Sequence, residues 1–201
     1  YIILALAAAG CAKAVVEGTN VAEKRYFDAW IQNNYPDAKS TELGVYILED
    51  TKGEGGKVVK EDGYMFDEYT TTDLEGNIST YTNKETAKQL GKYDTTTYYG
   101  PKVSTTFKNT IQAGLADVVL GMRVGDRKKV VIPGWLMTYS SYGSAEEYIE
   151  KATSGSHTIY DITIKDFTDT IGSWEKQQIQ KYFEANKAEF GDMDTTKFVV
   201  M

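Results

Sequence analysis

The side chains that could carry out covalent chemistry are few in this chain. Its 201 residues include one histidine, His157, and one cysteine, Cys11. A zinc site needs several His, Cys or carboxylate ligands, and a nucleophilic dyad needs an activating partner. These two residues alone predict neither kind of site. The glycines at 53–56 do not lead into an expected helix, so they do not form the usual phosphate-binding loop. We therefore look for a site that binds without covalent catalysis and expect no metal or cofactor.

The most informative pattern is the stretch from Ile111 to Leu136. It predicts a short helix at about 110–120, a glycine-marked turn at 121–126 and a strand at 127–132 that stops at a proline. With Gly121-Met122 and Val124-Gly125-Asp126-Arg127 in place, the stretch closely resembles the central motif of FK506-binding-type (FKBP-type) peptidyl-prolyl isomerases. The resemblance covers about residues 44–168 and is specific at 111–133 and 157–164.

This resemblance implies both a fold and an activity. The fold is α+β, an FKBP-like antiparallel half-barrel sheet wrapped on one short helix, here with helical extensions at both ends. The activity is rotation of the peptide bond before proline, whose barrier is ~18–20 kcal/mol. A catalyst for it holds the prolyl ring in a dry aromatic cup and favours the twisted amide. The family uses aromatic walls, a Trp floor, a Phe-Asp pair and a Tyr hydroxyl.

The floor of the pocket differs from the family pattern. Where the family has Trp after the helix glycine, Gly114 is followed here by Leu115. Leucine keeps an apolar base but removes much of the flat surface that an aromatic ring offers. Trp135 could supply a ring from another direction, and ordinary packing is the alternative for it.

The walls are tyrosine-rich. The resemblance places Tyr160 where the family has a pocket Phe, and Tyr139 or its neighbour Thr138 near the family's hydrogen-bonding Tyr. Ile111 or Gln112 would offer a backbone amide to ligand carbonyls. Because the chain has 15 tyrosines, structural packing is an equal alternative for each of them.

The Phe-Asp pair depends on the register of the preceding strands. If Glu68-Tyr69-Thr70 matches the family's His-Tyr-Thr strand, Tyr69 belongs to the pocket and 74–76 is a hairpin turn. Ser79 and Thr80 then replace the Phe-Asp pair. In a second register, Phe66-Asp67 matches the pair directly. We prefer the first, because the second requires a structureless insertion of some forty residues.

The N-terminal sequence predicts a lipid anchor. Residues 1–10 are uncharged, and Ala8-Ala9-Gly10-Cys11 resembles the lipobox of bacterial lipoproteins. We expect residues 1–11 to be a signal-peptide remnant with its lipobox. We expect Cys11 to be lipidated, which also accounts for the single thiol of the chain. The alternative is an inert buried cysteine. The expected place is the bacterial outer membrane, on either its periplasmic or its cell-surface side.

The composition is that of a soluble globular protein, with 41% hydrophobic and 25% charged residues and a net charge of -7. Nucleic acid is not an expected partner, because phosphate backbones favour clustered Lys and Arg. The densest basic cluster, at 123–129, is expected to be the solvated face of a turn and strand. By strand parity His157 lies opposite Tyr160, at the surface or in a cap.

Residues 12–43 are expected to form a tether and N-terminal helix, 44–168 the FKBP-like domain, and 169–201 a C-terminal helix and strand. One further helix is expected from Asn20 to Asn34, with a capping box between Asn20 and Glu23. Other helices are expected at 84–90, at 145–152 and from Ser173 to Phe190, and strands at 44–48, 64–72 and 157–167. Residues 181–185 echo 25–29, and 197–201 echo 44–48. This echo indicates either the start of a second, similar module or a chance likeness of two amphipathic helices.

Together these features predict a lipid-anchored protein that binds proline-containing polypeptide segments, with isomerase activity weak or lost. The alternative is a non-catalytic accessory lipoprotein that docks onto an outer-membrane barrel complex. A sugar-binding lipoprotein is a third and weaker interpretation, which rests only on the many Tyr and Trp residues.

Overall fold

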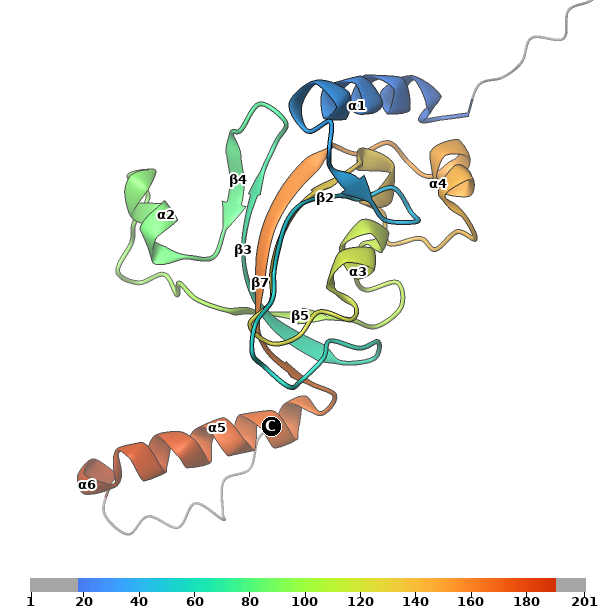
Figure 1. The fold of residues 1–201 in the computed structure, drawn as a ribbon. Coiled ribbons are helices and arrows are strands. Elements are labelled where there is room, and N and C mark those ends of the chain that lie inside the picture. The colour runs from blue at the N-terminus through green and yellow to red at the C-terminus, as the bar shows by residue number, and fades with distance from the viewer. Residues whose placement is uncertain (1–17, 191–201) are drawn as a thin grey trace, which may run out of the picture.

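The computed structural model describes residues 18–190. Cys11, the tether before residue 18 and the expected strand at 197–201 lie outside the described residues. Within them the α+β fold is as expected, with one curved antiparallel sheet and helices around it (Figure 1). The helices are α1 Val21–Asn34, α2 Lys84–Gln89, α3 Ala113–Val119, the 3-10 helix η1 Gly134–Leu136, α4 Ala145–Lys151, α5 Ile171–Ala185 and α6 Lys187–Phe190. The strands are β1 Lys39–Ser40, β2 Tyr46–Thr51, β3 Tyr64–Thr72, β4 Ile78–Tyr81, β5 Lys102–Thr105, β6 Arg127–Ile132 and β7 Thr158–Thr168.

The sheet runs in the order β1-β2-β6-β7-β3-β4, and β5 also pairs with β3. All pairs are antiparallel. β4 and β5 share one edge of β3, with β5 opposite residues 64–67 and β4 opposite residues 70–72. β5 was missed in the sequence because four partly exposed residues between loops give too short an alternation to recognise.

Helix α3 lies on the concave side of the curved sheet, as expected (Figure 1). Its Val118 and Val119 are buried in one core with Val130 of β6 and with Ile162 and Ile164 of β7. The alternation expected for β7 is confirmed, since its even-numbered residues from 160 to 164 face this core. A continuous apolar surface on one face of the sheet therefore fixes where the short helix packs.

Helix α1 closes one end of the core with Phe27 and Ile31, which are buried. The expected capping box is wrong, because the Asn20 side chain makes no cap hydrogen bond within α1. Asn20 is buried and donates instead to the carbonyl oxygens of Ile149 and Ala152 at 3.3 and 2.7 Å. A side chain expected to start a helix thus joins α1 to α4.

Helix α5 extends away from the sheet (Figure 1) and contributes no buried residue. It begins at Ile171 with Thr170 as the N-cap, so Ser173 does not cap it. Its main contact with the domain is Trp174, whose ring stacks on Phe66 at a centroid distance of 3.9 Å. The Trp174 indole N–H also donates to Asp166 at 2.7 Å.

Candidate proline-binding site

The position of α3 depends on a close approach of its first turn to the chain around it. The Ala113 N–H donates to the Thr138 carbonyl oxygen at 2.8 Å. A Cβ atom added at Gly114 would lie 2.3 Å from a methyl carbon of Ile132 and 2.9 Å from Cβ of Leu136. Only glycine fits at this contact, which holds the next residue of the helix, Leu115, in place.

The other end of α3 is held by β6. The Lys128 ammonium group donates to the Val118 carbonyl oxygen at 3.0 Å, across the concave face of the sheet. A cation at a helix C-terminus satisfies one of the carbonyl groups that have no partner within the helix. Both ends of this short helix are therefore fixed by the residues around it.

Two tyrosines face each other on the concave side of neighbouring strands. The rings of Tyr69 on β3 and Tyr160 on β7 have centroids 5.9 Å apart and are tilted by 39°. Burial, and then nearby Tyr69, Tyr139 and Asp67, together raise the pKa of Tyr160 to about 12. Burial and then Asp67 also raise the pKa of Tyr69. These hydroxyls therefore stay protonated and can donate hydrogen bonds.

The five residues expected in the pocket are not equally placed. Tyr69, Ile111, Leu115 and Tyr160 are half-buried and pack against the core. Tyr139 is 55% exposed. Ile111 and Tyr139 also border a cavity of about 480 Å³ on the side of α3 that carries Ala116 and Asp117, and its lining does not include the other three residues. The structure thus pairs Tyr69 with Tyr160 and leaves Tyr139 at a more open rim.

The strand pairing follows the preferred register. β3 and β4 form a hairpin in which Thr71 pairs with Thr80. Ser79 and Thr80 are exposed, and they stand where the resemblance places the Phe-Asp pair. The aromatic and acidic groups of that pair are therefore missing from β4.

The structure nevertheless places an acid beside the tyrosines. Asp67 is only 1% exposed and lies on the same face of β3 as Tyr69. Burial raises its pKa to about 6, against the lowering effect of a hydrogen bond with Ser104. Its Oδ1 atom is buried without a hydrogen-bond partner. The second register matches Phe66-Asp67 to the family's Phe-Asp pair. Phe66, however, lies on the opposite face of β3 from Asp67, and its ring stacks on that of Trp174.

Trp135 does not supply a pocket ring. It is buried and makes edge contacts with Phe27 and His157, at centroid distances of 5.5 and 5.7 Å. The surface position expected for His157 is wrong, since its side chain is 8% exposed. Its Nδ1 atom accepts the Gly134 N–H at 2.9 Å, so it does cap the start of η1. Burial lowers the pKa of His157, with Glu23 opposing this effect.

The acidic residue of the central motif has a structural role. Asp126 is buried and accepts the backbone N–H groups of Gly53 at 2.7 Å and Arg123 at 2.9 Å. Burial alone would raise its pKa, but these donors hold it below the usual range. A Cβ atom at Gly53 would lie 2.3 Å from the Gly125 carbonyl carbon. The glycine-rich loop at 53–56 thus packs on the motif's turn.

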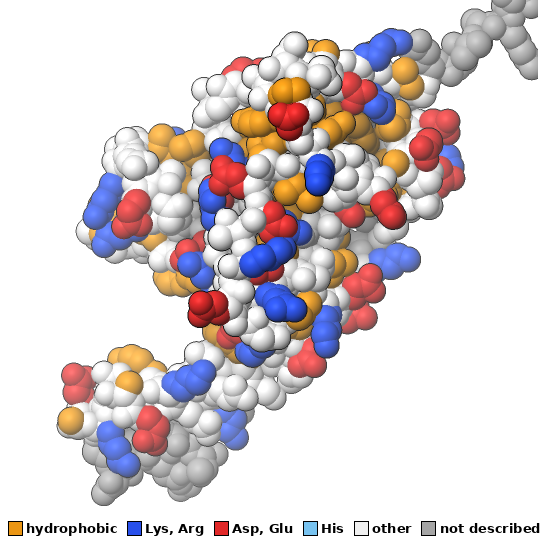
Figure 2. Space-filling view, in the orientation of Figure 1, with side chains coloured by type: hydrophobic (Ala, Val, Ile, Leu, Met, Phe, Trp, Pro, Cys, Tyr) orange, Lys and Arg blue, Asp and Glu red, His pale blue; other side chains and the backbone are white. Residues whose placement is uncertain are grey.

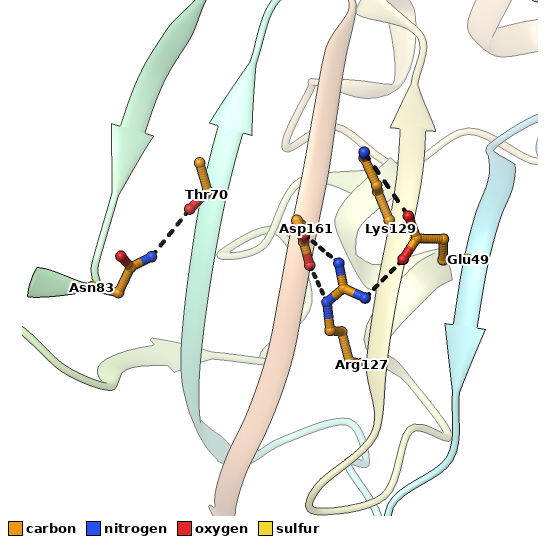
Figure 3. A network of polar contacts seen from close by, with 6 residues as sticks. All are labelled: Glu49, Thr70, Asn83, Arg127, Lys129 and Asp161. Carbon is orange, nitrogen blue, oxygen red and sulfur yellow. Dashed lines mark hydrogen bonds and ion pairs between the residues drawn. The ribbon is translucent and has the colours of Figure 1, made fainter. Parts of the chain in front are cut away.

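The opposite face of the sheet is polar. Arg127 of β6 bridges Asp161 of β7 and Glu49 of β2 with contacts of 2.6 to 2.7 Å, and Lys129 lies 4.0 Å from Glu49 (Figure 3). On the face of the molecule shown in Figure 2, basic and acidic side chains are interspersed rather than gathered by sign. Exposed pairs of this kind contribute only ~0–1 kcal/mol each. The basic cluster is thus the solvated face expected, apart from Lys128.

Among residues 18–190, no group of three or more His, Cys, Asp or Glu side chains could hold a metal ion. In the same part of the chain, no helix has the length and apolar character needed to cross a membrane.

No protein-family model and no curated protein matches the chain. The solved structures that are similar to it include two bacterial proteins. FkpA from Escherichia coli has a TM-score of 0.48 and 16% identity, over 74% of this chain and 59% of the FkpA chain. A peptidyl-prolyl cis-trans isomerase from Pseudomonas syringae pv. tomato str. DC3000 has a TM-score of 0.45 and 16% identity, over 74% of this chain and 93% of that one. These likenesses concern the fold alone.

Proposed function

We propose that this protein binds proline-containing polypeptide segments in an isomerase-like pocket, with weak or no turnover. The observation that carries the proposal is the facing pair Tyr69 and Tyr160 on the concave side of the sheet that α3 crosses. Leu115 and Ile111, at the start of that helix, are half-buried and supply apolar surface. Aromatic rings with polar tips beside apolar side chains suit a prolyl ring flanked by amide groups.

Weak turnover is proposed because two parts of the family's pocket are replaced. Leu115 offers no flat ring at the floor, and exposed Ser79 and Thr80 replace the Phe-Asp pair on β4. A catalyst lowers the barrier only through contacts that are stronger to the twisted amide than to the planar one. With fewer such contacts, the transition state is stabilised less relative to the bound ground state, and turnover is slower.

Calorimetric titration with a blocked Ala-Leu-Pro-Phe tetrapeptide tests binding, and a protease-coupled assay on the same peptide measures turnover. We expect peptide binding that Tyr160→Ala weakens about tenfold or more, since the change removes one wall of the pocket. Tyr182→Ala, on distant α5, is the matched control and leaves binding unchanged. Absence of peptide binding by the wild-type protein, or equal binding by Tyr160→Ala, contradicts the proposal.

Membrane attachment through Cys11 is the second part of the proposal, supported by the lipobox-like sequence before it. Several acyl chains on one residue bind a membrane firmly, at ~0.8 kcal/mol per buried methylene. The intact mass of protein extracted from membranes tests this: we expect the mass of acyl chains on Cys11 and none on a Cys11→Ser variant. An unmodified mass in the wild-type protein rules the anchor out.

A non-catalytic accessory role is the alternative, favoured by the exposed Ser79 and Thr80 at the place of the Phe-Asp pair. In this role the same scaffold docks onto an outer-membrane barrel complex. An inactive protein that co-purifies stoichiometrically with a barrel protein supports it. A substantial isomerase rate that falls with Tyr160→Ala supports the enzyme.

A further inference from the structure

Asp67 is a buried acid that the fold does not use. A desolvated carboxyl group is unfavourable unless it is paired, and native structures rarely leave its oxygens without a partner. Ser104 is near enough to lower the pKa of Asp67, yet the Oδ1 atom of Asp67 is buried with no hydrogen-bond partner. The pairing of β3 with β7 shifts at this point, because Phe66 lies opposite Asp166 and Asp67 opposite Ile164. The sheet is therefore irregular at the position of this buried carboxyl group.

The surroundings of Asp67 are those of the proposed binding pocket. Tyr69 follows it on the same face of β3, and Tyr160 lies near enough for the acid to raise the pKa of its hydroxyl group. Lys102 of β5 lies directly opposite in the register, and Ser104 is the donor on that strand. Tyr139, on the loop after η1, also lies near enough to raise the pKa of Tyr160. The facing groups are thus hydroxyls and one strand-edge lysine.

The chemistry of the ligand decides which form of the acid is useful. The amide bond before proline has a carbonyl oxygen and a fully substituted nitrogen, and neither carries a hydrogen. A carboxylate has only acceptors, so it cannot pair with such an amide. A protonated carboxyl group has one O–H donor. A neutral carboxylic acid beside a tyrosine is a known arrangement for donating hydrogen bonds in an apolar enzyme site.

We propose that Asp67 takes part in ligand binding as a neutral acid, donating its O–H to the amide bond that precedes the bound proline. The inference rests on the function proposed above and names the polar group that replaces the missing Phe-Asp pair. It makes Asp67 a residue that touches the substrate, and it makes binding depend on pH.

The test is the affinity for the blocked Ala-Leu-Pro-Phe tetrapeptide from pH 5 to pH 8. The neutral fraction of an acid falls tenfold for each pH unit above its pKa, so we expect Kd to rise about a hundredfold across this range. Asp67→Asn keeps a donor without titrating, and its Kd stays flat with pH. Asp67→Leu loses the donor and binds weakly throughout.

Glu68→Gln is the matched control, because Glu68 is the adjacent residue on the other face of β3 and pairs with Lys165. It keeps the wild-type pH profile. A second measurement follows the Asp67 carboxyl carbon by NMR: the peptide raises its pKa if the neutral form donates, whereas a merely structural acid keeps its pKa.

The outcomes separate the two proposals. Wild-type protein that binds no peptide at any pH overturns both the proposed function and this inference. Peptide binding that is independent of pH, or that Asp67→Leu leaves intact in a folded protein, overturns the role of Asp67 alone. Circular dichroism and thermal unfolding establish that each variant is folded.

Discussion

At the scale of single residues, the buried Asp67 makes the free energy of unfolding depend on pH. Burial raises its pKa from an ordinary 3.8 to about 6 in the folded protein, so the folded state holds the proton more tightly. The contribution of Asp67 to the free energy of unfolding is therefore most favourable below pH 3.8. It declines as the pH rises towards 6 and is constant above that.

We predict that Asp67→Asn removes this dependence. Because two pKa units correspond to about 3 kcal/mol, the free energy of unfolding of the variant relative to wild type should increase by up to about 3 kcal/mol from pH 3.5 to pH 7. Urea unfolding of both proteins across this range measures the difference. Comparing the two proteins cancels the opposite effect of His157, whose lowered pKa disfavours the fold as pH falls below 6.5. A constant difference between the proteins means that Asp67 does not titrate as stated.

Leu115 is the second residue whose type matters for the site. We predict that Leu115→Trp restores a flat floor and tightens binding of the blocked proline tetrapeptide about fivefold to tenfold, as an aromatic contact of ~1 kcal/mol would. Leu115→Met, which conserves volume without adding a ring, is the control and should match wild type. Tighter binding by Met than by Trp would show that the floor lies elsewhere.

At the scale of elements, α3 is positioned by sterics rather than by helix propensity. It is short and has no side-chain cap at Gln112, so isolated it would not be stable. The contacts of Gly114 with Ile132 and Leu136 explain why a glycine, otherwise unfavourable in a helix, precedes the floor residue.

We predict that Gly114→Ala lowers the free energy of unfolding by about 1–3 kcal/mol, because the added methyl overlaps packed atoms. Gly172→Ala in α5 is the matched control. Its Cβ would meet nothing within 4 Å, so we expect stability equal to wild type or up to about 1 kcal/mol higher. Chemical denaturation measures both, and equal stability of the two variants contradicts the steric account.

At the scale of the whole molecule, α3 packs on the curved sheet, and Trp174 joins α5 to it. The indole N–H and the Lys57 ammonium group both bind Asp166 at 2.7 Å. They lower its pKa although burial alone would raise it. The attachment is therefore local and partly exposed to solvent.

We predict that Trp174→Ala releases α5 without unfolding the domain. Amide hydrogen exchange in residues 171–185 should speed up by at least about tenfold, while β7 exchanges at the wild-type rate, because local opening is independent of the core. Lys176→Ala, an exposed change on the same helix, should leave both rates unchanged. Faster exchange throughout β7 would show that α5 supports the sheet.

Some elements of the structure could be predicted from the sequence alone and others could not. Helix α3, β6 and the alternation of β7 followed from local patterns, because burial against one sheet face imposes a period that a single segment displays. The β3–β4 hairpin followed from its turn residues and from the cost of a long insertion. β5, the contacts of Asn20 and the burial of His157 did not, since partners distant in the chain decide them.

Spacing and alternation in the sequence predicted the short helix, the strand after it and the alternating last strand, while the half-wrapped sheet and the places of the tyrosines at 69 and 160 were implied by the resemblance to FKBP-type isomerases. Only the tertiary structure decided that Trp135 packs in the core, that Phe66 is buried under Trp174 and that Asp67 is enclosed without a full set of partners. Whether a polar group is paired depends on atoms brought together from strands far apart in the chain, and no local pattern records their distances.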